Sequence, residues 1–189
     1  MDHDRSASSL NLFVTGRPGV GKTTLILKVL ERLGTDAGGF FTREIREGGR
    51  RLGFTIADLG GDTGVLAHVD QKSLYRVGKY GVNRRDLERV GVPAIERAVE
   101  GSSLVVMDEI GRMELCSPAF RSAVEKALDS PRTVFGTIQD RRNQFLDSVR
   151  ARPDVTVLRV TVENRDALAG QLVERISASL AEREGRSSR

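Results

Sequence analysis

The chain has 189 residues, of which 39% are hydrophobic and 30% are charged, a composition typical of one globular domain that builds its core without disulfides. No apolar run approaches the roughly 18 residues of a transmembrane helix, and the start lacks a signal peptide, so we expect a cytoplasmic protein with no membrane partner. The formal charge of +4 comes from dispersed, mostly arginine residues, and aromatic residues make up only 5% of the chain, so the sequence gives no strong nucleic-acid signal.

The two ends of the chain differ in composition from the remainder. Residues 1–9, MDHDRSASS, are small and polar, and are predicted to form a disordered lead-in. Residues 181–189, AEREGRSSR, are predicted to be the frayed tail of a last helix. Neither a linker nor a repeat divides residues 10–180, so we expect a single domain there, and we expect the protein to be a monomer.

Residues 10–180 alternate between apolar strands and amphipathic helices. In chain order the sequence predicts a strand at 10–15, a helix at 22–33, a hairpin whose two runs flank residues 47–49, and a helix at 84–100. Strands at 103–108, 132–138 and 155–160 then alternate with helices at 117–129, 143–150 and from about residue 164. Residues 60–83 are Gly-rich, with one short strand candidate at 74–82. This order predicts an α/β fold with a mostly parallel sheet, helices on both faces and an added antiparallel hairpin.

The turn after the first strand carries the strongest functional signal. It fits the phosphate-loop pattern G-x4-G-K-[ST] without a mismatch, over residues Gly16, Arg17, Pro18, Gly19, Val20, Gly21, Lys22 and Thr23. Glycines let backbone N–H groups approach phosphate oxygens, and the following helix N-terminus adds partial positive charge. Lys22 would reach the β- and γ-phosphates, and the Thr23 hydroxyl would ligate Mg²⁺. We therefore predict a P-loop nucleotide site, in which we include Thr24.

The strand at 103–108 ends in two consecutive acids, Asp108 and Glu109. Open α/β sheets bind their ligands at the carboxyl ends of strands. Asp108 is therefore interpreted as the Walker B acid that holds Mg²⁺ together with Thr23. We expect Glu109 to lie in the turn from strand to loop, beside the γ-phosphate and off the metal, where it would orient and deprotonate a water.

Three further candidates follow strands on the same edge of the predicted sheet. Thr137, near the end of the strand VFGTI, would bond the attacking water or the γ-phosphate, or serve only as a β-branched strand residue. Asn164 and Arg165 follow the last strand, where they would face the base or ribose, or cap the last helix.

A cation other than Lys22 and Mg²⁺ is expected to balance charge that develops on the γ-phosphate. Arg112 is the nearest arginine in sequence to the two acids. Its competitors are arginines of the predicted hairpin and arginines that follow the strand at 132–138: Arg43, Arg46, Arg141 and Arg142.

Several stretches together resemble one known family. In order and spacing, TGRPGVGKTTL, GGFFTREIREGGRRLGFTI, VVMDEIGRMEL, FGTI and VTVENRDAL resemble the THEP-type nucleoside-triphosphatases, over about residues 11–173. The resemblance implies a P-loop fold akin to the RecA and AAA+ group. It also implies Mg²⁺-dependent hydrolysis of ATP, GTP and other nucleoside triphosphates to diphosphate and phosphate, with broad base tolerance.

By position, the resemblance implies that two stretches of this chain bind the nucleotide. These are the loop Gly16–Thr23 and the segment Asp108–Gly111, so that Ile110 and Gly111 join the candidate site. The chain departs from the family pattern within residues 60–83. After GTI it reads QDRRN, where the resemblance would place a proline-rich, lysine-bearing loop.

Three functions are compatible with these residues. The first is a hydrolase in which Lys22, Glu109 and Arg112 are catalytic. The second is a nucleotide or polynucleotide kinase in which residues 60–83 form an acceptor lid. The third is a slow nucleotide-dependent switch. We take the hydrolase as the prediction, because Glu109 follows the metal-side acid directly and is suited to activate water.

Overall fold

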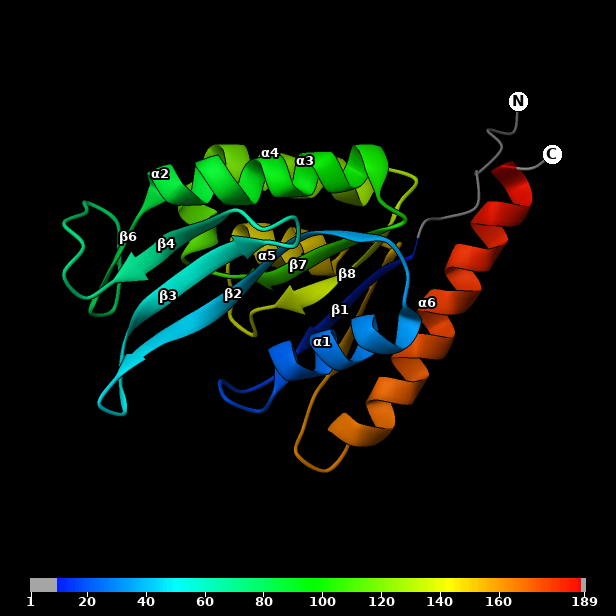
Figure 1. Ribbon diagram of the computed structural model, residues 1–189, viewed down its shortest axis with the longest axis horizontal. Coiled ribbons are helices and arrows are strands. Elements are labelled where there is room, and N and C mark those ends of the chain that lie inside the picture. The colour runs from blue at the N-terminus through cyan, green and yellow to red at the C-terminus, as the bar shows by residue number, and fades with distance from the viewer. Residues whose placement is uncertain (1–9, 188–189) are drawn as a thin grey trace.

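The computed structural model describes residues 10–187, so the predicted lead-in, residues 1–9, lies outside the described residues. Nine strands form one sheet in the order β5-β6-β4-β3-β2-β7-β8-β1-β9 (Figure 1). The strands are β1 (Asn11–Thr15), β2 (Ala37–Glu47), β3 (Arg50–Asp58), β4 (Thr63–His68), β5 (Arg76–Val77), β6 (Tyr80–Val82), β7 (Leu104–Ile110), β8 (Thr133–Ile138) and β9 (Val155–Arg159).

The sheet has a parallel half and an antiparallel half. Strands β2, β7, β8, β1 and β9 pair in parallel, whereas β3, β4, β6 and β5 extend the sheet from β2 by antiparallel pairs. The predicted α/β P-loop fold is confirmed, and the predicted hairpin is β2–β3. The antiparallel part is larger than predicted, because residues 60–83 add three short strands to the edge of that hairpin.

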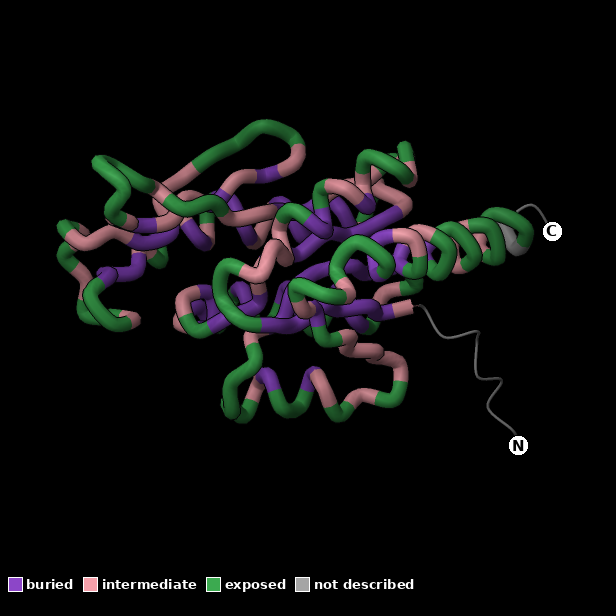
Figure 2. Tube along the Cα trace, turned by 90° about the horizontal axis from the view of Figure 1, so that it is seen from below, coloured by how far each residue is buried: buried purple, intermediate pink, exposed green. Residues whose placement is uncertain are grey.

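Helices cover both faces of the sheet, as predicted (Figure 1). They are α1 (Lys22–Leu33), α2 (Arg84–Asp86), α3 (Val92–Gly101), α4 (Pro118–Asp129), α5 (Gln144–Arg150) and α6 (Arg165–Ser187), with short irregular turns at Leu87–Gly91 and Glu114–Cys116. Because side chains alternate along a strand, β7 sends Val105 and Met107 to the core under α3 and α4, and Leu104 and Val106 to the core under α1 and α6. β1 and β8 are accordingly buried throughout and β7 nearly so, while many of the connecting loops are exposed (Figure 2).

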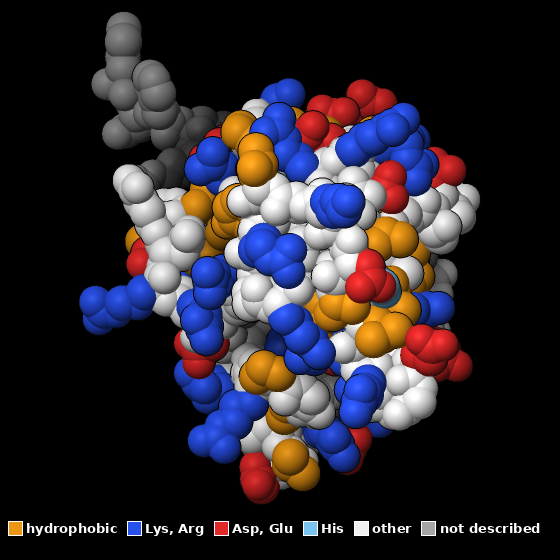
Figure 3. All heavy atoms as spheres, turned by 90° about the vertical axis from the view of Figure 1, so that its left-hand side faces the viewer, with side chains coloured by type: hydrophobic (Ala, Val, Ile, Leu, Met, Phe, Trp, Pro, Cys, Tyr) orange, Lys and Arg blue, Asp and Glu red, His pale blue; other side chains and the backbone are white. Residues whose placement is uncertain are grey.

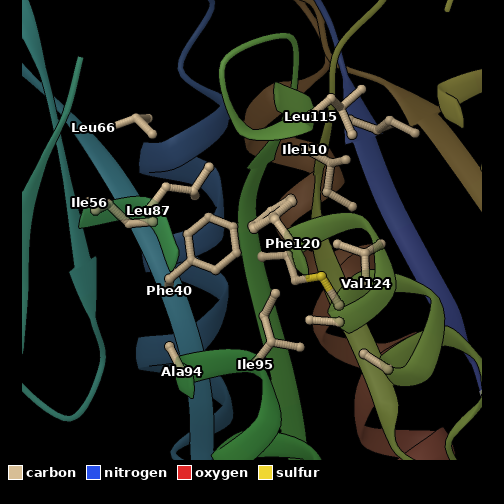
Figure 4. Packing of buried hydrophobic residues seen from close by; sticks show 14 of the residues in the cluster. Phe40, Ile56, Leu66, Leu87, Ala94, Ile95, Ile110, Leu115, Phe120 and Val124 are labelled. Carbon is tan, nitrogen blue, oxygen red and sulfur yellow. The ribbon is translucent and has the colours of Figure 1, made fainter. Parts of the chain in front are cut away.

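The core under α3 and α4 joins the two halves of the sheet. Phe40 of β2 packs against Phe120 of α4, with ring centroids 5.5 Å apart in an edge-to-face arrangement. Ile56 and Leu66 from the antiparallel strands reach the same cluster, as does Ile110 from β7 (Figure 4). The antiparallel extension therefore shares a core with the parallel sheet, and this core supports the strand that carries the two acids.

The helix predicted at 84–100 is interrupted. It consists of α2, a π-helical turn at Leu87–Gly91 and then α3, which has Pro93 in its first turn. Proline has no N–H to donate to the preceding turn, and widened π turns accommodate such breaks in a helical path. The helix predicted at 84–100 is therefore present, with a π-helical turn inside it that was not predicted.

The end of the chain also differs from the prediction. The last helix, α6, continues to Ser187, through most of the segment 181–189 that the sequence predicts to be frayed. Residues 188–189 lie outside the described residues. None of the helices within residues 10–187 combines the length and hydropathy needed to cross a membrane.

Phe120→Ala is expected to lower the free energy of unfolding by about 3–5 kcal/mol, because it removes a fully buried ring and leaves a cavity in the shared core. Urea denaturation measures the change. Leu27→Ala on α1 is the control: its side chain is 37% exposed, so the loss should stay below about 1 kcal/mol. Equal losses in the two variants would contradict the packing described.

Candidate functional site

A cavity of about 920 Å³ lies at the carboxyl ends of the parallel strands and continues along the antiparallel ones. Its inner part is lined by the turn after β1 and by the end of β7. Its outer part is lined by residues of the antiparallel strands, among them Phe54, Leu66 and Tyr80. The predicted site residues that line it are Gly16, Arg17, Pro18, Gly19, Gly21, Lys22, Thr23, Thr24, Asp108, Glu109 and Arg112. Val20 lies in the same loop but is not a lining residue.

The turn from β1 to α1 wraps around the inner end of the cavity. Gly19 and Gly21 have φ angles of 79° and 100°, a conformation that glycine adopts without strain. The helix α1 begins at Lys22, so its unpaired N–H groups open into this loop. The Lys22 ammonium donates to the Gly16 carbonyl over 3.2 Å. The loop thus surrounds a concave, electropositive space suited to an anion.

Asp108 is buried at the end of β7, with 1% of its surface exposed. Its Oδ1 accepts a hydrogen bond of 2.6 Å from the Thr137 hydroxyl, whereas its Oδ2 is buried with no hydrogen-bond partner. Burial raises the pKa of the Asp108 carboxyl, and the hydroxyls of Thr137 and Thr23 and the charge of Lys22 act in the opposite direction. A buried carboxylate oxygen without a partner, beside the Thr23 hydroxyl, fits the oxygen donors that Mg²⁺ prefers.

Glu109 lies beside Lys22 at the inner end of the cavity. Its Oε2 is 3.5 Å from the Lys22 ammonium, and its Oε1 accepts a hydrogen bond of 3.3 Å from Gln139. Burial raises the pKa of Glu109, the charge of Lys22 lowers it and the charge of Asp108 raises it. The sequence places Glu109 in a turn, and this was wrong: β7 continues to Ile110, although its pairing with β8 shifts register between Met107 and Ile110.

Arginines gather around the outer part of the cavity. Arg112 is exposed and lines the cavity, as do three of its competitors, Arg43, Arg46 and Arg141, whereas Arg142 does not. Arg46 is held by Glu44, with 2.6 Å between Nε and Oε2. Figure 3 views the end of the molecule formed by the antiparallel strands, where basic side chains are spread over the surface among fewer acidic ones.

The remaining predicted site residues lie around the cavity and not on its wall. Thr137 is fully buried, and its hydroxyl donates to Asp108. It does not face the space where a phosphate would lie. Asn164 has its side-chain oxygen bonded to the Thr161 N–H and its side-chain nitrogen bonded to the Arg159 carbonyl, an arrangement that stabilises the turn before α6. Arg165 donates to the Val20 carbonyl over 3.3 Å, so it supports the phosphate loop from behind.

Ile110 and Gly111, which joined the site by resemblance, lie just behind the two acids. Ile110 is fully buried in the core under α3 and α4. The Gly111 N–H donates to Glu114 Oε2 over 3.0 Å. Neither residue lines the cavity.

The fold agrees with that of known proteins. A family profile described as NTPase matches residues 11–173. The chain belongs to the NTPase family. It is 45% identical over 175 residues to the nucleoside-triphosphatase THEP1 of Thermotoga maritima, a match that covers 93% of this chain and 100% of the relative. It is 40% identical over 185 residues to a cancer-related nucleoside-triphosphatase homolog of Bos taurus, covering 89% of this chain and 97% of the relative.

Among solved structures, this NTPase-family chain superposes on the crystal structure of THEP1 from the hyperthermophile Aquifex aeolicus with a TM-score of 0.82 and 34% sequence identity. The superposition covers 88% of this chain and 99% of the other. The resemblance to THEP-type nucleoside-triphosphatases is therefore confirmed.

Among the lining residues that were not predicted, Glu114 and Gln139 lie beside the two acids. Glu114 follows Arg112 by two positions, but it is 5% exposed and lines the cavity. Burial, together with the charge of Glu109, raises its pKa to about 8. Gln139 follows β8 and lines the cavity beside Glu109. Its position at the carboxyl end of a strand was the available signal, whereas nothing in the sequence distinguishes Glu114 from an exposed acid.

Glu114 should make stability depend on pH. Its pKa is about 8 in the folded protein against an ordinary value of 4.5. Between these values the folded chain binds a proton that the unfolded chain has lost, so the free energy of unfolding falls as pH rises, by at most about 1.4 kcal/mol per pH unit. Glu114→Gln removes this titration and keeps an acceptor for the Gly111 N–H.

We expect the stability of Glu114→Gln relative to the wild type to increase steadily between about pH 5 and pH 8. Urea denaturation of both proteins at several pH values measures the difference. A difference that stays constant over this range would show that Glu114 is not a buried carboxyl that holds its proton.

Proposed function

We propose that this NTPase-family protein is a nucleoside-triphosphate phosphohydrolase that hydrolyses ATP, GTP and other nucleoside triphosphates to diphosphate and phosphate. One observation carries the proposal: the Glu109 carboxylate lies inside the cavity of the phosphate loop, 3.5 Å from the Lys22 ammonium. Two similar proteins, from Thermotoga maritima and Bos taurus, are named as nucleoside-triphosphatases.

The proposed substrate position follows from the loop. The β- and γ-phosphates occupy the space enclosed by Gly16–Thr23, where backbone N–H groups and the start of α1 favour negative charge. Lys22 bonds Glu109 and the Gly16 carbonyl in this structure. Binding of a triphosphate gives Lys22 stronger anionic partners, so the Glu109 carboxylate is released from its ion pair.

Glu109 is the proposed base. Once free of Lys22, its Oε2 accepts the proton of a water that attacks the γ-phosphorus, while the bond to the leaving diphosphate oxygen breaks. Lys22 stays on the phosphates, where it balances the charge that develops in the transition state. Arg112, which is exposed and lines the cavity, is the proposed second cation.

Mg²⁺ is the proposed cofactor. Within residues 10–187 no group of three or more His, Cys, Asp or Glu side chains can hold a metal ion by itself, but Mg²⁺ at nucleotide sites usually combines one or two protein oxygens with phosphate oxygens and water. Asp108 Oδ2 and the Thr23 hydroxyl would supply those protein oxygens. The ion would polarise the phosphates as a Lewis acid.

Broad base tolerance is proposed because the two residues predicted to face the base or ribose, Asn164 and Arg165, are bonded elsewhere, and Arg165 donates to the Val20 carbonyl. Both amide atoms of Asn164 bond local backbone, and strong selectivity requires a site built to hydrogen-bond one base. The kinase alternative has no comparable support. Residues 63–68, 76–77 and 80–82 of its supposed acceptor lid are strands at the edge of the sheet.

Glu109→Gln is expected to keep binding of Mg-ATP and to lower kcat about a hundredfold or more, because the amide preserves the shape but cannot accept the proton. Phosphate release at saturating ATP measures turnover, and a fluorescent nucleotide analogue measures binding. Full activity in this variant would remove Glu109 from the mechanism.

Lys22→Ala is expected to weaken nucleotide binding and to lower kcat, since Lys22 is the one lysine of the loop that would contact the phosphates in both ground and transition states. Glu31→Ala, on the exposed side of α1, is the control and should leave both quantities unchanged. Unchanged turnover of Lys22→Ala at saturating ATP would contradict the assignment of the phosphate loop.

Phosphate release should be seen with ATP, GTP, CTP and UTP at rates within about tenfold of one another, and it should stop when EDTA removes Mg²⁺. The assay is repeated with nucleoside monophosphates and 5′-hydroxyl oligonucleotides as acceptors. Phosphate transfer to an acceptor that exceeds phosphate release would favour the kinase.

A further inference from the structure

The side chain of Gln139 joins the end of β7 to the loop that follows it. Its Nε2 donates to Glu109 Oε1 over 3.3 Å, and its Oε1 accepts the Arg112 N–H over 3.3 Å. Its backbone N–H donates to the Ile110 carbonyl over 3.0 Å. Gln139, directly after β8, therefore bonds Glu109, Ile110 and Arg112 at the end of β7 and just beyond it.

A side chain at the neighbouring Gly111 would crowd this contact. A β-carbon built on Gly111 would lie 3.0 Å from Glu109 Oε1, 3.2 Å from Glu114 Oε2 and 3.4 Å from Gln139 Nε2. Glu109 of β7, Glu114 of the turn Glu114–Cys116 and Gln139 after β8 thus surround one glycine. Gln139 itself is partly exposed and lines the cavity, so its two side-chain hydrogen bonds set its orientation.

Lys22 and Gln139 hold different oxygens of the same carboxylate. The lysine faces Oε2, and the amide of Gln139 donates to Oε1. The triphosphate is proposed to draw Lys22 away, which removes one of these two restraints. A carboxylate with four lone-pair positions and no fixed partner would rotate freely, and a small misorientation at a reacting group costs a large factor in rate.

We propose that Gln139 is a positioning residue for hydrolysis. Its side-chain nitrogen holds Glu109 Oε1, while its side-chain oxygen is fixed by the Arg112 N–H. These bonds keep Glu109 Oε2 directed at the attacking water after Lys22 has moved to the phosphates. This inference rests on the proposed hydrolase function. It assigns Gln139 no contact with the substrate, so its effect is on kcat and passes through Glu109.

Two variants separate this role from general packing. Gln139→Met has a similar length and removes both hydrogen bonds, whereas Gln139→Asn keeps the amide but shortens the side chain by one methylene. Both are expected to lower kcat about tenfold or more and to change the KM and the Kd for a nucleotide analogue by less than about twofold. The matched control is Gln171→Met, at an exposed position of α6, which should behave as the wild type.

A double-mutant cycle with Glu109→Gln tests whether the effect passes through the acid. If Gln139 acts only by orienting Glu109, Gln139→Met should lower kcat in the wild-type background and have no further effect in the Glu109→Gln background. An equal loss in both backgrounds would overturn the inference, because Gln139 would then act independently of the acid.

The remaining outcomes are equally decisive. Wild-type kcat in both Gln139 variants, or a loss confined to nucleotide affinity, would overturn the positioning role. If Gln139→Met does not fold, as judged by its thermal unfolding transition, Gln139→Asn decides the question. Failure of the wild-type protein to release phosphate would instead refute the proposed function, so the two failures are distinguishable.

Discussion

The position of β8 between β1 and β7 determines how the site is built. Val14 of β1 lies opposite Thr137 of β8, and the Thr137 hydroxyl bonds Asp108 of β7 over 2.6 Å. This contact ties the strand that enters the phosphate loop to the strand that carries the acids. Close approach is possible because β8 has Gly136 beside Met107: a β-carbon at Gly136 would lie 2.1 Å from the Met107 carbonyl oxygen.

The electrostatics of the site follow from that assembly. Asp108, Glu109 and Glu114 meet in a buried space, and burial raises the pKa of each. Lys22 is the cation that faces this group directly. Because buried like charges do not remain ionised together without a counter-charge, the protein holds Glu114 protonated near neutral pH. Under the proposed function a triphosphate would add further negative charge, which the proposed metal ion beside Asp108 and the arginines around the cavity would balance.

The sequence predicts the parts of the fold and site that depend on local patterns. The strand, glycine turn and helix around Gly16–Thr23 are contiguous, and Gly34 ends α1 as expected. The parallel sheet followed from apolar runs that alternate with amphipathic helices. By contrast, the strand candidate at 74–82 is divided into β5, with two residues, and β6, with three, and β4 (Thr63–His68) was not predicted. The antiparallel extension was therefore only partly predicted from residues 60–83.

The side-chain contacts of the site were predicted less well for a related reason. Gln139 and Glu109 are separated by 30 positions in the chain and meet only because β8 and β7 are neighbours. Glu114 is a buried acid, and acids are usually exposed. Asn164 was predicted to face the base or ribose or to cap the last helix, but its side chain bonds the Thr161 N–H and the Arg159 carbonyl in the turn before α6. Local sequence fixes a turn more readily than it fixes a contact between strands.

The most direct test of the account is a crystal structure with Mg²⁺ and a non-hydrolysable ATP analogue. The account predicts the β- and γ-phosphates within the loop Gly16–Thr23, the metal at the Thr23 hydroxyl and beside Asp108, and Lys22 on the phosphates. Glu109 should then be free of Lys22 and still bonded to Gln139. A triphosphate bound elsewhere in the cavity, or Lys22 still paired with Glu109 when the loop is occupied, would contradict it.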